Sequence, residues 1–274
     1  MNITQAEKAK RFRALHAAPG IFVIPNPWDA VSARLLVARG FTALATSSAA
    51  AAALLGKADN TITRDEALAH ARLIAGVVDV PVSADLENGF GAATATVAET
   101  IRLAAGAGLA GGSIEDSSGD PVHPLYDLNL AVERVAAAGE AARSTGLGFV
   151  LTARTENLLH DVGGLDETVR RLQAYERAGA DVLFAPGLRK LEDIRAVCAA
   201  VKKPVNFMGG MKGMNFTVAE LAAAGVKRIS LAASLYRAAL TGVDAAAREI
   251  RDQGTFTYAS RILTSDEVRP LLRP

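Results

Sequence analysis

GAGLAGGSIED (residues 106–116) has the form that decides the fold: glycines after an alanine-rich helix, a short apolar run, and acidic residues at its end. Glycine just past a helix commonly adopts the left-handed conformation that stops the helix. The apolar run that follows is therefore predicted to be a strand. The same phrase recurs as ARGFTALATSS (38–48), RAGADVLFAPG (177–187) and AAGVKRISLAAS (223–234).

Four more apolar runs complete a set of eight predicted strands: GIFVIPN (20–26), VPVSADLE (80–87), GFVLTART (148–155) and KPVNFMG (203–209). Runs such as IFVI and DVLF do not alternate, which is typical of parallel strands covered on both faces. Eight β-then-α units predict one domain over residues 1–274, an α/β fold of the (β/α)8 TIM-barrel type. An open doubly wound sheet is the alternative, although IPNPWDA lacks the G-x-G-x-x-G turn of dinucleotide-binding sheets.

Composition argues against several classes of partner and location. Half of the residues are apolar, 22% are charged and the net charge is +1, so we expect no nucleic-acid and no membrane-surface partner. No long uncharged apolar run predicts a membrane span, and the N-terminus has no apolar core of a secretory signal. The single cysteine, Cys198, excludes a disulfide within the chain, and we expect a cytoplasmic protein.

Carboxylates gather where the predicted strands end, which is where TIM barrels place their active sites. Asp85 and Glu87 end the third strand, Glu115 ends the fourth, and Asp59 lies in the loop after the second. A divalent cation would remove the repulsion between such charges. Oxygen ligands without a His or Cys cluster favour Mg²⁺, or Mn²⁺, over Zn²⁺. The alternative is that these acids cap helices or lie in solvated loops.

Cationic and small residues at other strand ends predict an anionic substrate. Arg154, after the fifth strand, can bind a carboxylate with its guanidinium fork, unless it pairs with a barrel acid. Ser47, Ser48 and Ala49 begin a turn that can present backbone N–H groups to an anion, or simply cap a helix. His123, in the candidate lid SSGDPVHPLYD (117–127), is a possible proton carrier or a solvated loop histidine.

The chain resembles the isocitrate lyase/phosphoenolpyruvate mutase superfamily over nearly its whole length. The resemblance rests on the order and spacing of NPWDAVSARLL, the SSA turn, GKADN, ADLENGFG, SIED and LTARTE. It implies a barrel whose eighth helix is swapped with a neighbouring subunit, so that the C-terminal helices in residues 243–274 pack on that subunit in a homodimer or homotetramer.

The same resemblance implies a Mg²⁺ ion held directly by Asp85, with Glu87 and Glu115 acting largely through water. It implies small 2-oxo acid substrates, whose C–C or P–C bonds are made or broken next to an enolate stabilised by the metal. The serine turn and Arg154 fall on positions that grip substrate carboxylates. Pocket positions also match Trp28, Asp29, Asp59 and Asn206.

Departures from the family narrow the expected reaction. The lyase branch carries a Lys-x-Cys-Gly-His segment after the fourth strand, and its cysteine is the catalytic acid, whereas residues 117–127 contain no cysteine. Cys198 lies in the helical run LEDIRAVCAAV, where a structural thiol is expected. Pro186 and Gly187 stand where the lyases show a glutamate, and Glu87 replaces the usual aspartate. The pattern therefore favours the mutase-like branch over a typical isocitrate lyase.

The leading hypothesis is a Mg²⁺-dependent carbon–carbon lyase acting on a small 2-oxo dicarboxylate, by decarboxylation or hydrolysis of an oxaloacetate-like acid. Asp59, Glu115, Arg154 and His123 are its candidate catalytic residues. The alternatives are P–C bond chemistry on phosphonopyruvate, or a paralogue that binds 2-oxo acids without turnover. A Schiff-base aldolase is disfavoured because Lys203 and Lys227 lie at strand starts.

Overall fold

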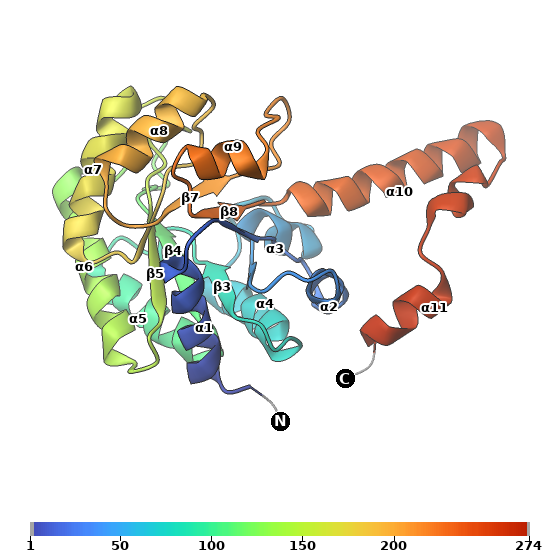
Figure 1. The fold of residues 1–274 in the computed structure, drawn as a ribbon, viewed down its shortest axis with the longest axis horizontal. Helices are drawn as coiled ribbons and strands as arrows, with labels where there is room; N and C mark the ends of the chain where they lie inside the picture. The colour runs from blue at the N-terminus through green and yellow to red at the C-terminus, as the bar shows by residue number, and fades with distance from the viewer. Residues whose placement is uncertain (1–2, 273–274) are drawn as a thin grey trace.

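Eight parallel strands with interleaved helices form a nearly closed barrel in a computed structural model that describes residues 3–272 (Figure 1). The strand order is β1-β8-β7-β6-β5-β4-β3-β2, which confirms the predicted (β/α)8 TIM barrel. The strands are β1 Phe22–Ile24, β2 Leu44–Ala45, β3 Val82–Asp85, β4 Gly111–Glu115, β5 Val150–Arg154, β6 Val182–Phe184, β7 Val205–Met208 and β8 Arg228–Ser230.

The α-helices in the body of the barrel are α1 Gln5–Ala17, α2 Ala30–Ala38, α3 Ser48–Leu54, α4 Arg64–Gly76, α5 Thr94–Gly106, α6 Leu128–Ser144, α7 Gly164–Ala178, α8 Leu191–Ala200 and α9 Val218–Ala223. After the eighth strand come α10 Ser234–Gln253, η1 Thr257–Arg261, α11 Ser265–Val268 and η2 Arg269–Leu272. Each of the eight strands predicted from the sequence is present.

The seam between β1 and β2 closes the barrel with few bonds. No paired register joins these two strands in the described part of the chain, and Pro25, just after β1, has no N–H to donate. Ala45 N donates to Pro25 O at 3.0 Å. The buried Asn26 side chain adds a second bond across the seam, because its Nδ2 donates to Thr46 O at 2.7 Å. Its Oδ1 accepts from Leu231 N, just after β8, at 2.8 Å.

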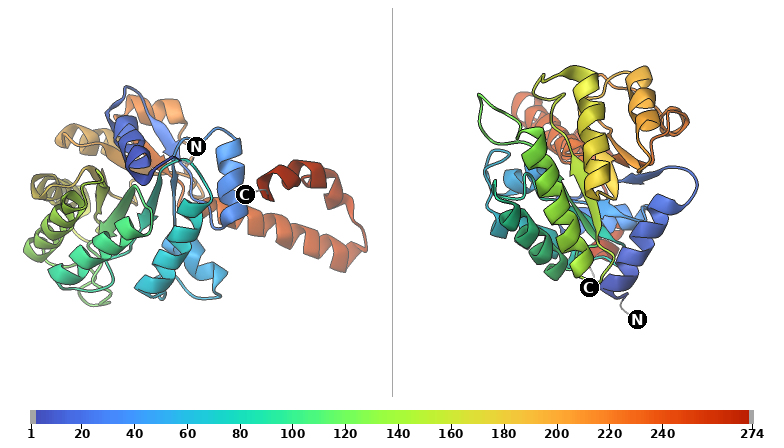
Figure 2. Two further views of the ribbon diagram at one scale, coloured as in Figure 1. Left: turned by 90° about the horizontal axis from the view of Figure 1, so that it is seen from below. Right: turned by 90° about the vertical axis from the view of Figure 1, so that its left-hand side faces the viewer.

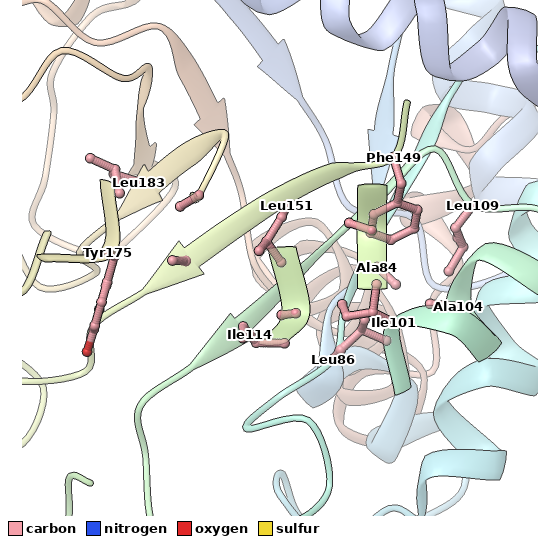
Figure 3. Close-up of a cluster of buried hydrophobic side chains, with 14 of the residues drawn as sticks. Ala84, Leu86, Ile101, Ala104, Leu109, Ile114, Phe149, Leu151, Tyr175 and Leu183 are labelled. Carbon is pink, nitrogen blue, oxygen red and sulfur yellow. The ribbon is translucent and has the colours of Figure 1, made fainter. Parts of the chain in front are cut away.

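The main core lies between the outer face of the barrel and the surrounding helices. Figure 3 shows Leu86 and Phe149 packed against Ile101 of α5 and Leu109, all four almost fully buried. Burying a side chain of this size contributes roughly 1.5–3 kcal/mol. This layer fixes the strands whose other face lines the barrel interior.

Helix α1 closes the N-terminal end of the barrel. Phe12 is fully buried there in a cluster with Ile24, Val150 and Val182. Gly111 is required beside it, because a Cβ at this position would lie 2.9 Å from Phe12 Cε1 and 2.7 Å from Val150 O. The barrel is therefore plugged at one end, and its interior is open only toward the C-terminal ends of the strands.

Helix α10 runs away from the barrel as one continuous helix (Figures 1 and 2). The C-terminal helices were expected in residues 243–274, but α10 already begins at Ser234 and runs through Gly242, because one glycine in a helix interior costs only about 1 kcal/mol. None of its residues is buried. Among residues 3–272, the helices are too short or too polar to span a membrane.

Candidate active site

A cavity of about 960 Å³ opens at the C-terminal ends of the strands and reaches into the barrel. The inward positions of β2, β3 and β4 carry the small residues Ala45, Ser83 and Ser113, so they leave space where barrels usually carry branched side chains. Most of the predicted substrate-binding residues line this cavity: Ser47, Ser48, Ala49, Asp59, Asp85, Arg154 and Asn206.

A second cavity, of about 1200 Å³, is lined by Glu87 and Glu115 together with parts of the loop 117–124. Arg154 links the acids of the two cavities. Its Nη1 lies 3.4 Å from Glu115 Oε2 and 3.8 Å from Asp85 Oδ2. Two of the three acids expected to bind a metal, Asp85 and Glu115, therefore lie beside one arginine.

The sheet register and the turn after β2 position these groups. Glu115 and Arg154 are directly paired across β4 and β5. Asp85 ends β3, and its backbone N–H donates to Thr46 Oγ1 at 3.0 Å. Asp85 Oδ2 accepts from Ser48 N at 3.2 Å, so the turn at the start of α3 orients the carboxylate. Ser47 caps the same helix, and its Oγ accepts from Ala50 N, so the predicted capping role and a role at the cavity coexist.

Glu87 is held in an unusual state. Its φ is +48°, in the left-handed region that non-glycine residues seldom occupy. The residue is only 7% exposed, and its Oε1 is buried without a hydrogen-bond partner in the described chain. Burial, then Asp85 and Asp59, raise the pKa of the Glu87 carboxyl to about 7, while Arg154 opposes this. A carboxylate here lacks the stabilisation that the protein usually provides.

Glu115 and Arg154 are both buried, and each opposes the effect of burial on the pKa of the other. Burial raises the pKa of Glu115 well above its usual value, and Arg154 opposes this rise. The negative charges of Glu156, Asp85 and Glu87 raise the pKa of Glu115 further. Burial lowers the pKa of Arg154, but Glu115, Glu156 and Asp85 together raise it well above normal. Arg154 Nε also donates to Glu156 Oε1. The predicted pairing of Arg154 with acids is therefore observed, and because Arg154 also lines the cavity, its role in binding substrate stays a prediction.

The donor set fits a divalent cation bound partly through water. Within residues 3–272, no three acidic, His or Cys side chains close around one point as a complete ligand set. The unpartnered Oε1 of Glu87, whose pKa is raised by burial and by Asp85 and Asp59, nevertheless indicates a carboxylate without a close positive partner. Hard oxygen ligands of this kind match Mg²⁺ or Mn²⁺, which retain several waters in protein sites.

Asp116, next to Glu115, has a supporting role that the sequence analysis did not identify. It is 3% exposed, and its carboxylate accepts from Glu156 N at 2.8 Å, Arg171 Nη1 at 2.9 Å and Tyr175 OH. Glu156 in turn bonds Arg154. The network therefore fixes the segment after β5 from behind. In the sequence, the two adjacent acids of SIED (113–116) were the signal that could have pointed to Asp116.

Three predicted residues are not brought to either cavity. Trp28 packs edge-on against Tyr236 at 5.9 Å, and Asp29 caps α2 by accepting from Ser32 N at 2.7 Å. His123 is exposed on the loop 117–127 and lines neither space, as a solvated loop histidine would. Another histidine, His160, does line the cavity beside Glu87 and Glu115. Nothing in its local sequence distinguished it.

Cys198 lies on α8, on the outer layer of the barrel, in the position expected of a structural thiol. Burial raises the pKa of this thiol to about 11. A thiol so far from ionisation is a poor proton donor or nucleophile near neutral pH.

The sequence profile of the phosphoenolpyruvate phosphomutase family matches residues 12–251. The chain belongs to this family. It therefore lies within the isocitrate lyase/phosphoenolpyruvate mutase superfamily, as the resemblance implied. The matched residues include all eight strands and most of α10.

Known proteins of the superfamily are similar over most of the chain. A structure from Burkholderia cenocepacia J2315, provisionally described as a lyase/mutase, is 52% identical with a TM-score of 0.95 and covers 97% of this chain and 96% of its own. The 2-methylisocitrate lyase of Escherichia coli (strain K12) is 32% identical, covering 90% of this chain and 85% of that protein. An oxaloacetate decarboxylase of Bradyrhizobium diazoefficiens is 31% identical, and the alignment covers 76% of this chain and 73% of that protein.

Proposed function

We propose that this protein is a divalent-cation-dependent lyase that cleaves a C–C bond in a small 2-oxo dicarboxylate. Decarboxylation or hydrolysis of an oxaloacetate-like acid fits best. The observation that carries the proposal is the junction of Asp85, Glu115 and Arg154 between the two cavities, with contacts of 3.4 and 3.8 Å. The similarity to 2-methylisocitrate lyase and to oxaloacetate decarboxylase supports the same class of reaction.

The roles proposed for the acids follow the family resemblance. Asp85 would hold the cation directly, and the Ser48 N–H orients its carboxylate. Glu87 and Glu115 would hold the cation through water. A divalent cation bound there supplies Lewis acidity toward a 2-oxo group. Arg154 holds a substrate carboxylate beside the junction, and a preset orientation of this kind lowers the entropic cost of reaching the transition state.

Decarboxylation or hydrolysis fits better than isocitrate-type cleavage because the usual acid is absent. Residues 117–127 contain no cysteine, and Cys198 lies on α8 with a pKa of about 11. A second candidate is P–C bond chemistry on phosphonopyruvate. The match to the phosphoenolpyruvate phosphomutase profile over residues 12–251 favours it.

Turnover of the purified protein against oxaloacetate, phosphonopyruvate and 2-methylisocitrate, with and without Mg²⁺, tests the proposal. We expect Mg²⁺-dependent loss of oxaloacetate.

Asp85→Ala should abolish cation binding in calorimetry and lower kcat/KM at least about 100-fold, while the fold is kept. Asp166→Ala, an exposed acid on α7, is the matched control. Phosphonopyruvate turnover alone would select the second candidate, and binding without any turnover would identify a 2-oxo acid-binding paralogue.

A further inference from the structure

His160 lies beside the acids of the proposed cation site. It belongs to the loop between β5 and α7, it is exposed, and it lines the second cavity together with Glu87 and Glu115. His123, the histidine singled out from the sequence, lines neither cavity. The structure therefore moves the candidate proton carrier from the loop after β4 to the loop after β5.

One buried asparagine ties together the loop that carries His160. Asn157 is fully buried, and its Nδ2 donates to Val162 O at 3.0 Å and to Gly164 O at 2.9 Å. Its Oδ1 accepts from Thr168 Oγ1, on α7, at 3.0 Å. Val162 N also donates to Asn157 O at 2.8 Å. The residues before His160 are therefore bonded to the residues after it, and both are bonded to α7.

The loop after β6 makes room for the loop that carries His160. Gly187 has a φ of +98°, and a Cβ at this position would lie 2.9 Å from Leu158 Cβ and 3.3 Å from Leu159 Cδ2. A larger residue at 187 would therefore push the neighbouring loop away. Asp161, next to His160, has a φ of +60°, a conformation that non-glycine residues seldom adopt. Tertiary contacts thus hold this loop in one position, as a side chain that transfers protons requires.

The residues that line the two cavities leave His160 as the group suited to carry a proton near neutral pH. In the described chain, no cysteine, no tyrosine and no second histidine lines either cavity. Imidazole is the side chain that changes charge between about pH 5 and 8. Guanidinium groups keep their protons in this range, aspartates ionise below it, and the two glutamates are proposed to hold the cation. The charged groups that face His160 are Arg64, Asp65, Glu87, Glu115 and Asp120 across the cavity, and Asp161 in its own loop.

Either reaction proposed for this site requires one proton at a carbon atom. In decarboxylation of oxaloacetate the C3–C4 bond breaks, carbon dioxide leaves, and the bonding pair stays in the enolate of pyruvate. In hydrolysis water adds to C2 and gives up both of its protons, the C2–C3 bond breaks, and oxalate and the enolate of acetate form. Each enolate then takes up one proton at C3. A cation stabilises an enolate but brings no proton, so a separate donor is needed.

We propose that protonated His160 supplies this proton by way of a water molecule in the second cavity. The imidazolium gives up one proton in each turnover and regains one from solvent through the same cavity, so no further reactant is required. This inference rests on the proposed function and deepens it, because it names the proton donor of the same site.

Turnover of oxaloacetate at saturating Mg²⁺, measured as a function of pH, compares the wild type with His160→Gln. A donor that must be protonated gives the wild type a kcat that falls as the pH rises through the histidine range. His160→Gln should lower kcat about 100-fold, leave KM within about two-fold and lose this fall. Free imidazole should restore part of the activity of His160→Ala. His123→Gln, on an exposed loop histidine outside both cavities, is the matched control and should behave as the wild type.

Calorimetry with oxalate, a stable analogue of the enolate of pyruvate, adds a measurement that needs no turnover. An anion bound near His160 favours the imidazolium, so oxalate binding at saturating Mg²⁺ should take up part of a proton. Titrations in two buffers of different ionisation enthalpy measure this uptake, which should be smaller in His160→Gln and unchanged in His123→Gln.

A kcat and a pH profile that His160→Gln leaves unchanged in an active enzyme would overturn the role of His160 alone. So would a raised KM with an unchanged kcat, because His160 would then act in binding. A wild type that turns over neither oxaloacetate nor phosphonopyruvate would overturn the proposed function, and the role of His160 with it.

Discussion

At the scale of single residues, Glu87 shows how a fold can hold a carboxyl group ready for a cation. Its backbone is in the left-handed region, and one of its oxygens is buried without a partner. Burial, and then the negative charges of Asp85 and Asp59, raise the pKa of its carboxyl to about 7, against the opposing effect of Arg154. Near neutral pH the Glu87 carboxyl is therefore partly protonated and partly ionised, and a bound cation would favour its ionised form.

The raised pKa of Glu87 predicts a pH-dependent stability. Between its ordinary value of 4.5 and about 7, the folded protein holds a proton that the unfolded chain releases. The free energy of unfolding should therefore fall as the pH rises through this window, and cation affinity should rise. Urea unfolding at pH 5, 6, 7 and 8 without metal measures the first effect, and Mg²⁺ titration at the same pH values measures the second.

Glu87→Gln should reduce both pH dependences, because its side chain does not titrate. Glu133→Gln, an exposed acid on α6, is the control and should behave as the wild type. Identical slopes in the wild type and in Glu87→Gln would show that Glu87 ionises normally.

Residue identities allowed the acids of the site to be predicted, but not their surroundings. Asp85, Glu115 and Arg154 could be located because parallel strands bring their C-terminal ends together. Arg228 could not, because KRISL looks like the start of a strand with a solvated end. Its burial depends on the register of β8 with β7 and on His16 from α1, which are contacts between distant parts of the chain.

At the scale of elements, α6 holds the loop that follows β3. Arg134 of α6 is 1% exposed, donates to the carbonyls of Asn88, Gly91 and Ala92, and lies over the ring of Tyr126 at 4.2 Å. The loop continues directly from Glu87. A helix on the outside of the barrel therefore controls the geometry of a proposed metal-binding residue.

Arg134→Met should lower the free energy of unfolding by about 3 kcal/mol, because several buried carbonyls lose a charged donor at once. It should also weaken Mg²⁺ binding, since the loop after Glu87 is released. Chemical denaturation and calorimetry measure the two effects. Arg143→Met, in the exposed last turn of α6, should change stability by no more than about 0.5 kcal/mol. Unchanged Mg²⁺ affinity in Arg134→Met would separate the helix from the site.

At the scale of the whole molecule, an apolar groove and an apolar stripe on helix α10 are both uncovered in the described chain. The groove, of about 280 Å³, is lined by Val23, Phe207 and Ile229 on the outer face of β1, β7 and β8, where a barrel normally packs its eighth helix. Helix α10 instead extends outward, with Leu240, Val243 and Ile250 exposed on it. We propose that α10 of a second copy covers this groove, as the family resemblance implied for residues 243–274, of which 273–274 lie outside the described residues.

Val243→Asp should therefore convert a homodimer or homotetramer into smaller species, because it places a charge on the apolar stripe of α10. Ala245→Asp introduces the same charge on another face of the helix, and we expect it to leave the oligomer intact. Size-exclusion chromatography with light scattering measures both. A monomeric wild type would contradict the exchange of α10.

The phrase of helix, glycine and strand in four units and the apolar runs of the other four made the barrel predictable as a whole. The course of α10 was less predictable, because local preferences say nothing about which copy a helix packs on.

The weak seam between β1 and β2 also has a dynamic consequence. A sheet opens most easily where fewest hydrogen bonds must break together, and here the backbone bond from Ala45 N to Pro25 O and the bond from the Asn26 amide to Thr46 O join β1 to β2. Breathing of the barrel should start at this seam, and the amide hydrogen of Ala45, which makes the seam bond, should exchange with solvent sooner than those of β4 and β5. The seam adjoins the serine turn at Ser47, so the wall of the cavity that yields first is also the wall proposed to hold the substrate.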